Sequence, residues 1–95
     1  MSAYISAKIQ VKNPEKLKEY ISKLPATMAP YGGTLVYRGK VSKTLLGDAS
    51  HQIEAVFAFP SEEVIDEWYN SDAYQAIIPI RDEGCTGEIT VLSAM

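Results

Sequence analysis

The chain of 95 residues is 46% apolar, 22% charged and 9% aromatic, a composition typical of one small globular domain. We therefore expect a single domain over residues 1–95. With 9 basic and 12 acidic side chains the formal charge is −3, which argues against a nucleic-acid partner because no positive field attracts a phosphate backbone. The apolar stretches are also shorter than the roughly 20 residues of a membrane span. These features predict a soluble, cytoplasmic protein that contacts neither nucleic acid nor membrane.

The cysteine and histidine content limits the available chemistry. Cys85 is the only cysteine, so the chain forms no internal disulfide and no cysteine-based metal cluster. His51 is the only histidine, and no carboxylate stands near it at the spacing of metal ligands. A glycine-rich nucleotide-binding motif is also absent from the sequence. We expect no metal and no cofactor, and we expect Cys85 to be a buried or idle thiol.

The start of the chain predicts a strand followed by a helix. Apolar residues alternate with other types from Tyr4 to Val11, a pattern typical of a strand with one dry face. Asn13 and Pro14 then supply a helix cap and a proline at the first helical position, and apolar residues spaced three and four apart continue to Met28. Pro25 lacks a backbone N–H, which predicts that this helix bends or restarts there.

The middle of the chain predicts a pair of neighbouring strands. One runs from Thr34 to about Val41, after two glycines that end the first helix. The other, Gln52 to Phe59, again alternates between apolar and polar residues. Gly47 and Asp48 form a turn signal between them, so the two strands are expected to pair as a hairpin.

The last third predicts two helical segments and a final strand. Ser61 is a helix cap with acidic residues following it, and residues 70–72 interrupt the helical pattern and cap a further segment. Pro79 is expected to bend or end that segment. The final strand is expected at Glu88–Leu92.

The order β-α-β-β-α-β predicts an α+β, ferredoxin-like fold, with a four-stranded antiparallel sheet and both helices on one face. The alternate residues of each strand are then expected on the other face: Tyr4, Ser6, Lys8, Val36, Arg38, Lys40, Glu54, Val56, Ala58, Glu88, Thr90 and Leu92. Because this uncovered face is partly apolar, we predict a homodimer formed through it.

Short motifs over nearly the whole chain point to one family: Tyr4-Ile5 with Ala7, Tyr31-Gly32-Gly33, Arg38-Gly39, Phe59-Pro60-Ser61, and residues 68–75. Together they resemble the DUF1330 family of uncharacterised bacterial proteins. The most specific part is Tyr69-Asn70-Ser71 followed by Tyr74-Gln75, because helix periodicity does not require its polar pattern. The resemblance implies a dimeric α/β barrel, in which two ferredoxin-like protomers turn their sheets toward each other. It implies no activity.

The most specific motif supplies the first candidate site. Asn70, Ser71 and Tyr74 meet at the break between the two last helical segments, where an amide, a hydroxyl and a phenol could orient a ligand. The same residues are also typical of a helix cap and a packed tyrosine, and this structural interpretation is the stronger of the two. Both interpretations stay open.

Arg38 and His51 are the other candidates. On the uncovered face, Arg38 could receive a carboxylate, phosphate or enolate of a small molecule, or it could pair with Glu54 or Glu88. His51, in the loop before the third strand, could act as a general base or could simply be solvated. We therefore predict Arg38, Asn70, Ser71 and Tyr74 as ligand-binding residues, and Arg38, Tyr74 and His51 as catalytic candidates.

Two functions remain open from the sequence. One is a cofactor-independent enzyme that acts on a small organic molecule in a pocket of a dimeric α/β barrel. The alternative is a non-catalytic module that binds a small molecule or only dimerises. Kinship of the fold with enzymes favours the first by analogy.

Overall fold

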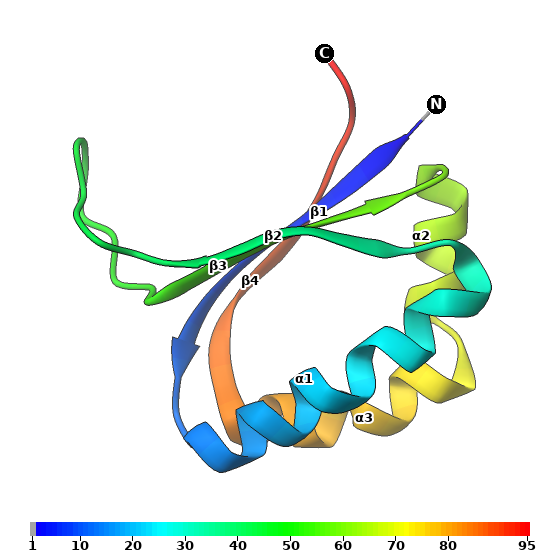
Figure 1. The fold of residues 1–95 in the computed structure, drawn as a ribbon, viewed down its shortest axis with the longest axis horizontal. Helices are drawn as coiled ribbons and strands as arrows, with labels where there is room; N and C mark the ends of the chain where they lie inside the picture. The colour runs from blue at the N-terminus through cyan, green and yellow to red at the C-terminus, as the bar shows by residue number, and fades with distance from the viewer. Residues whose placement is uncertain (1) are drawn as a thin grey trace.

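The computed structural model describes residues 2–95 and contains one four-stranded antiparallel sheet with its helices on one face (Figure 1). The elements in chain order are β1 (Ala3–Val11), α1 (Pro14–Met28), the 3-10 helix η1 (Ala29–Tyr31), β2 (Thr34–Lys40), β3 (Ile53–Phe59), α2 (Glu62–Tyr69), α3 (Asp72–Gly84) and β4 (Cys85–Leu92). The strands lie in the order β2-β3-β1-β4. The predicted ferredoxin-like fold is confirmed.

The core lies between the sheet and the helices. Ile5 of β1 pairs with Phe57 of β3 and with Val91 of β4, so these three side chains share the face that the helices cover. Opposite them, the buried side chains of α1, α2 and α3 are Leu17, Tyr20, Leu24, Thr27, Met28, Ile65, Trp68, Tyr74 and Ile77. The alternation in the sequence therefore gave the correct inward face of β1 and β3.

Polar side chains fix the starts of the three helices. The Asn13 Oδ1 atom accepts from the backbone N–H groups of Glu15 and Lys16, the Ser61 Oγ atom accepts from Val64, and Ser71 Oγ accepts from Tyr74. These are the first-turn N–H groups that have no partner inside a helix. The helix starts expected at these caps are confirmed.

The two prolines do not interrupt their helices. Helix α1 continues through Pro25 to Met28 without restarting, and α3 continues through Pro79 to Gly84. Both prolines are exposed, and each removes one backbone N–H from the hydrogen bonds of its helix. The packing of the buried side chains on either side of each proline outweighs the loss of one backbone hydrogen bond. Of the alternatives expected for each proline, the restart at Pro25 and the end at Pro79 do not occur, and a bend at either position stays a prediction.

Strand β4 starts three residues earlier than expected. Cys85 already pairs with Val11, and Gly87 pairs with Ile9 at a φ of 154°. A Cβ on Gly87 would lie 2.0 Å from the Lys8 carbonyl oxygen, so only glycine permits this close pairing.

A β-bulge in β2 reverses the face of Arg38. Leu35 pairs with Phe57, but Tyr37 pairs with the next residue of β3, Val56, so Val36 is an extra residue in the strand. Arg38 then pairs with Ala55 and lies on the helix side of the sheet. The prediction that Arg38 lies on the uncovered face was wrong, because one inserted residue moves every later side chain of a strand to the other face. Lys40, which pairs with Ile53, shifts in the same way.

The face of the sheet away from the helices, called the open face below, is apolar at one end and charged at the other. Its apolar end carries Tyr4, Tyr37, Val56, Ala58 and Leu92. Residues 41–52, called the arm, join β2 to β3 and point away from the helices (Figure 1). Within residues 2–95, no helix combines the length and apolarity needed to cross a membrane.

Candidate functional site

The last turn of α3 carries a partly buried arginine, Arg81. Helix α3 approaches α1 very closely at Gly84, where a Cβ would lie 2.6 Å from the backbone nitrogen of Leu17. The carbonyl oxygen of Gly84 also accepts from the backbone N–H groups of Lys12 and Asn13. These contacts fix the end of α3 against the start of α1 and so position Arg81.

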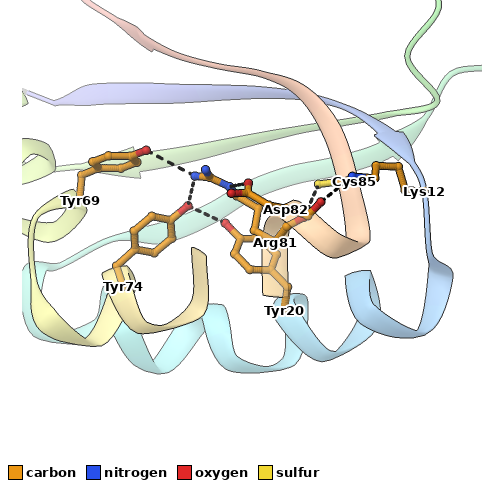
Figure 2. Close-up of polar contacts among 7 residues, drawn as sticks. All are labelled: Lys12, Tyr20, Tyr69, Tyr74, Arg81, Asp82 and Cys85. Atoms are coloured by element: carbon orange, nitrogen blue, oxygen red, sulfur yellow. Dashed lines mark hydrogen bonds and ion pairs between the residues drawn. The ribbon is translucent and has the colours of Figure 1, made fainter. Parts of the chain in front are cut away.

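The guanidinium of Arg81 is held mainly by tyrosine hydroxyls (Figure 2). Its Nη1 atom donates to the hydroxyl oxygens of Tyr69, at 3.4 Å, and Tyr74, at 3.2 Å. Tyr74 has an exposed fraction of 0%, and its hydroxyl lies 2.8 Å from that of Tyr20. The Arg81 Nε atom donates to the carboxylate of Asp82 at 3.1 Å. We call Tyr20, Tyr69, Tyr74 and Arg81 the Arg81 cluster.

Tyr20 and Arg81, at the two ends of this cluster, each keep a single protonation state at neutral pH. Burial and the neighbouring hydroxyl of Tyr74 raise the pKa of Tyr20 above its ordinary value. Desolvation opposes the charged form of Arg81, but the hydrogen bonds to Tyr69 and Tyr74 outweigh it and hold its pKa above the ordinary value. The cluster therefore presents a neutral phenol and a cation.

A cleft of about 690 Å³ opens beside Arg81, between the β1–β4 side of the sheet and helices α2 and α3. Its apolar wall is formed by Ile5, Ile9, Ile65, Trp68, Ile89 and Val91. The polar groups that line it are mainly Arg81, Tyr69, Lys12, Asp66 and Asp82. Mostly apolar walls with a few polar groups, and a volume between about 300 and 1,000 Å³, are typical of small-molecule sites.

A second, smaller apolar cavity of about 50 Å³, called the inner cavity below, lies between the sheet and α1. Arg81 and Trp68 line both the cleft and the inner cavity, so they form part of the boundary between them. Tyr20 and Tyr74 line only the inner cavity. Arg38 lines it as well, from β2 at the opposite edge of the sheet from β4.

The side chains of Asn70 and Ser71 form hydrogen bonds with backbone groups at the end of α2 and the start of α3. The Ser71 hydroxyl donates to the carbonyl of Trp68 and accepts from the N–H of Tyr74, and the Asn70 amide donates to the carbonyl of Asp66. These bonds set the corner between α2 and α3, which carries Tyr74. Of the four predicted ligand-binding residues, Arg38 and Tyr74 thus share a cavity, whereas Asn70 and Ser71 orient the backbone beside it.

His51 lies apart from this site. Its Nε2 atom is 2.6 Å from the carboxylate of Glu54, at the point where the arm joins β3. That hydrogen bond lowers the pKa of Glu54. His51 lines a separate pocket between the arm and the open face, together with Lys8 and Glu88.

Cys85 is buried at the end of α3, and its thiol donates to the carbonyl of Arg81. Burial raises the pKa of this thiol, which makes it a poor nucleophile at neutral pH. Within residues 2–95, no group of three or more His, Cys, Asp or Glu side chains could hold a metal ion.

Arg81 and Tyr20 are the site residues that the sequence analysis missed. Arg81 follows Tyr74 by seven residues, which is two helical turns on one face, and this spacing was available in the sequence. The bend or end expected at Pro79, between the two residues, hid this relation. The contact of Tyr20 with Tyr74 joins α1 to α3, and no local pattern predicts it.

The family model for a domain of unknown function, DUF1330, matches residues 2–95. The chain belongs to the DUF1330 family. No curated protein matches it. Among solved structures, a protein of unknown function from Rhodopseudomonas palustris is similar with a TM-score of 0.86 and 13% identity, over 99% of this chain and 82% of that one.

Two further structures share the fold of this DUF1330 protein. SnoaB, a cofactor-independent oxygenase from Streptomyces nogalater, has a TM-score of 0.73 and 10% identity, over 99% of this chain and 93% of that one. A dimeric ferredoxin-like protein of unknown function from Jannaschia sp. CCS1 has a TM-score of 0.75 and 13% identity, over 100% and 99% of the two chains. At such identities the likeness concerns the fold.

Proposed function

We propose that this DUF1330 protein binds a small, oxygen-bearing organic molecule in the cleft, with Arg81 as the anchor. The observation that carries the proposal is the position of the guanidinium. The Arg81 side chain is only 18% exposed, yet the one carboxylate that it contacts belongs to Asp82, which is itself 63% exposed. A partly buried cation without a buried counter-charge is well suited to an oxygen atom of a ligand.

The walls of the cleft support the same proposal. The apolar side chains of β1 and β4 face Ile65 and Trp68 of α2 across the cleft, and they offer contact to a hydrocarbon or aromatic body. Tyr74, predicted from the sequence as a ligand-binding residue, meets the ligand where the cleft adjoins the inner cavity. Arg38 meets only a ligand that extends through the inner cavity toward β2.

A second candidate function is catalysis on that molecule without a cofactor. The cationic Arg81 next to an apolar wall is suited to stabilise negative charge that develops on a substrate oxygen. The shared fold with the oxygenase SnoaB favours this candidate by analogy. Asp66 and Asp82 are the carboxylates lining the cleft that could accept a proton.

We also propose that the protein forms a homodimer through the open face. The apolar end of that face is uncovered, and the arm beside it exposes Leu45 and Leu46 by 89% and 95%. The arm and the open-face residues Lys8 and Glu88 line one pocket, so the arm extends beside the surface that a second copy would contact. The structure from Jannaschia is described as dimeric, which supports association of this fold, whereas the choice of the open face rests on its apolar end.

Binding is tested by comparing Arg81→Met with Lys18→Met. Both changes remove one positive charge, but Lys18 is exposed on α1 and lines none of the three pockets described above. A panel of small organic acids and phenols is screened by thermal shift, and hits are measured by calorimetry. We expect hits to bind the parent and Lys18→Met equally and Arg81→Met at least about tenfold more weakly. Equal affinity for all three proteins, or no hit in the panel, would contradict the proposal.

A further inference from the structure

Arg81 has donor hydrogens without acceptors. A guanidinium carries five N–H hydrogens and accepts no hydrogen bond. The two hydrogens of Nη1 are donated to the hydroxyl oxygens of Tyr69 and Tyr74, and the single hydrogen of Nε is donated to the Asp82 carboxylate. The two hydrogens of Nη2 have no acceptor within residues 2–95. Every fully buried side-chain nitrogen or oxygen in that range has a partner, so Nη2 is at least partly accessible to solvent.

The buried pair of Tyr20 and Tyr74 also has one hydroxyl hydrogen more than it has acceptors. Tyr20 and Tyr74 together carry two hydroxyl hydrogens, and a single hydrogen bond of 2.8 Å joins their oxygens. The Tyr74 oxygen also accepts from Arg81. Whichever tyrosine donates to the other, one hydroxyl hydrogen remains without an acceptor among the described residues. Both side chains line the inner cavity, so this hydrogen is available there.

None of the charged and titratable groups near the cluster takes these hydrogens. The carboxylate of Asp82, in α3, accepts a hydrogen bond only from the Arg81 Nε atom. The backbone carbonyl of Asp82 accepts from the Lys12 side chain in the β1–α1 turn. Cys85 of β4 donates to a backbone carbonyl rather than accepting. Asp66 of α2 and Arg38 of β2 line the neighbouring walls without a hydrogen bond to the cluster. The site thus offers donors without matching acceptors.

We propose that the Arg81 cluster binds its ligand as an oxyanion, a carboxylate, enolate or phenolate at the end of an apolar body, and thereby makes the bound acid easier to ionise. This inference rests on the proposed function and names the ligand's charge state. In the step, the O–H or C–H bond of the ligand breaks, the electron pair stays on the ligand, and the proton passes to water.

Arg81, which the cleft and the inner cavity share, indicates where the oxyanion binds. Tyr74 lies on the inner side of the boundary that Arg81 forms between them. A ligand oxygen there accepts hydrogen bonds from Nη2 and from the free tyrosine hydroxyl, while the body of the ligand contacts the cleft walls. The apolar surroundings strengthen such charge-assisted bonds. Because burial raises the pKa of Tyr20, its phenol stays protonated and remains a donor.

The test uses 4-nitrophenol, whose phenolate is read directly by its visible absorbance. Absorbance is recorded against pH, with and without saturating protein, and binding of 4-nitroanisole, which cannot ionise, is measured in parallel. We expect the pKa of the bound phenol to lie at least about one unit below the free value, which equals a tenfold preference for the anion. We expect 4-nitroanisole to bind at least about tenfold more weakly than the phenolate.

Variants assign the effect to the cluster. Arg81→Met and the double variant Tyr20→Phe with Tyr74→Phe should each return the bound pKa to nearly the free value. Tyr20→Phe alone still leaves the Tyr74 hydrogen free, so it should keep most of the shift and serves as the variant least disturbing to the core. Tyr31→Phe, in η1, changes a tyrosine that lines none of the three pockets and is the control.

The two proposals fail in different ways. If 4-nitrophenol binds the parent and loses affinity in Arg81→Met, but its bound pKa is unchanged or raised, the cleft is a binding site and the oxyanion inference is wrong. If neither probe binds at any pH, both proposals are wrong. A lowered pKa that persists in Arg81→Met and in the double variant also contradicts the inference.

Discussion

At the scale of single residues, the fold and the site meet in the hydroxyl of Tyr20. This hydroxyl is buried in the core and bonds to Tyr74, which in turn accepts from Arg81. A phenol in this position stabilises the packing of α1 on α3 only while it stays protonated. The same protonation leaves one hydroxyl hydrogen of the Tyr20–Tyr74 pair available to the site, whichever of the two tyrosines carries it.

The raised pKa of Tyr20 predicts a specific loss of stability in alkali. Because the folded-state value lies above the ordinary value of 10.0, the contribution is fully present below pH 10 and is lost as pH rises toward the folded-state pKa. Chemical denaturation at increasing pH should show the parent losing free energy of unfolding faster than Tyr20→Phe. Parallel losses in the two proteins would show that Tyr20 ionises freely in the fold.

At the scale of elements, the close approach of α3 to α1 decides where Arg81 lies. Alanine is normally better than glycine inside a helix by about 1 kcal/mol. At Gly84 the opposite is expected, because a methyl group would collide with the backbone of Leu17 and force the helices apart. Gly84→Ala should therefore destabilise the protein by about 1–3 kcal/mol.

The control for this prediction is Gly47→Ala in the arm. A Cβ there meets nothing within 4 Å, although its φ of +84° disfavours a side chain. We expect Gly47→Ala to cost less than Gly84→Ala, and only Gly84→Ala to weaken ligand binding, because only that change displaces Arg81. Denaturation curves and the thermal-shift screen measure both effects. A stabilised Gly84→Ala variant would contradict the described packing.

The same elements show how far the sequence alone could lead. Strand alternation and capping residues are local, so the order of elements, the dry faces of β1 and β3 and the helix starts at Asn13, Ser61 and Ser71 were predictable. The bulge at Val36 was not, because an inserted residue is recognised only against the partner strand.

The candidate site was predicted only in part for related reasons. Tyr74 stood out because its motif is unusual. Arg81 was missed because Pro79 was expected to bend or end the helix, whereas tertiary packing carries α3 through it. The inner cavity brings Tyr20 of α1 together with Arg81, residues far apart in the sequence. Such contacts follow from the assembled fold and not from any local pattern.

At the scale of the whole molecule, the uncovered sheet predicts association. A domain of 95 residues buries a modest fraction of its surface, so covering the apolar end of the open face should add stability. Light scattering should give twice the 10.5 kDa mass of the chain, and the melting temperature should rise with protein concentration. Val56→Glu on the open face should lower both the mass from light scattering and the dependence of the melting temperature on protein concentration, whereas Lys18→Glu on α1 should change neither. A monomeric mass at micromolar concentration together with concentration-independent melting would contradict the dimer.

The central claim, that Arg81 anchors an organic oxyanion in the cleft, is tested most directly by nuclear magnetic resonance. The sequence contains only two arginines, Arg38 and Arg81, so their side-chain Nε–H signals are readily assigned with one variant. During titration with 4-nitrophenolate, the Arg81 signal should shift to saturation, and the signal of Arg38, which lines the inner cavity but not the cleft, should move much less. An unshifted Arg81 signal at saturating probe, or a shift of Arg38 alone, would contradict the account.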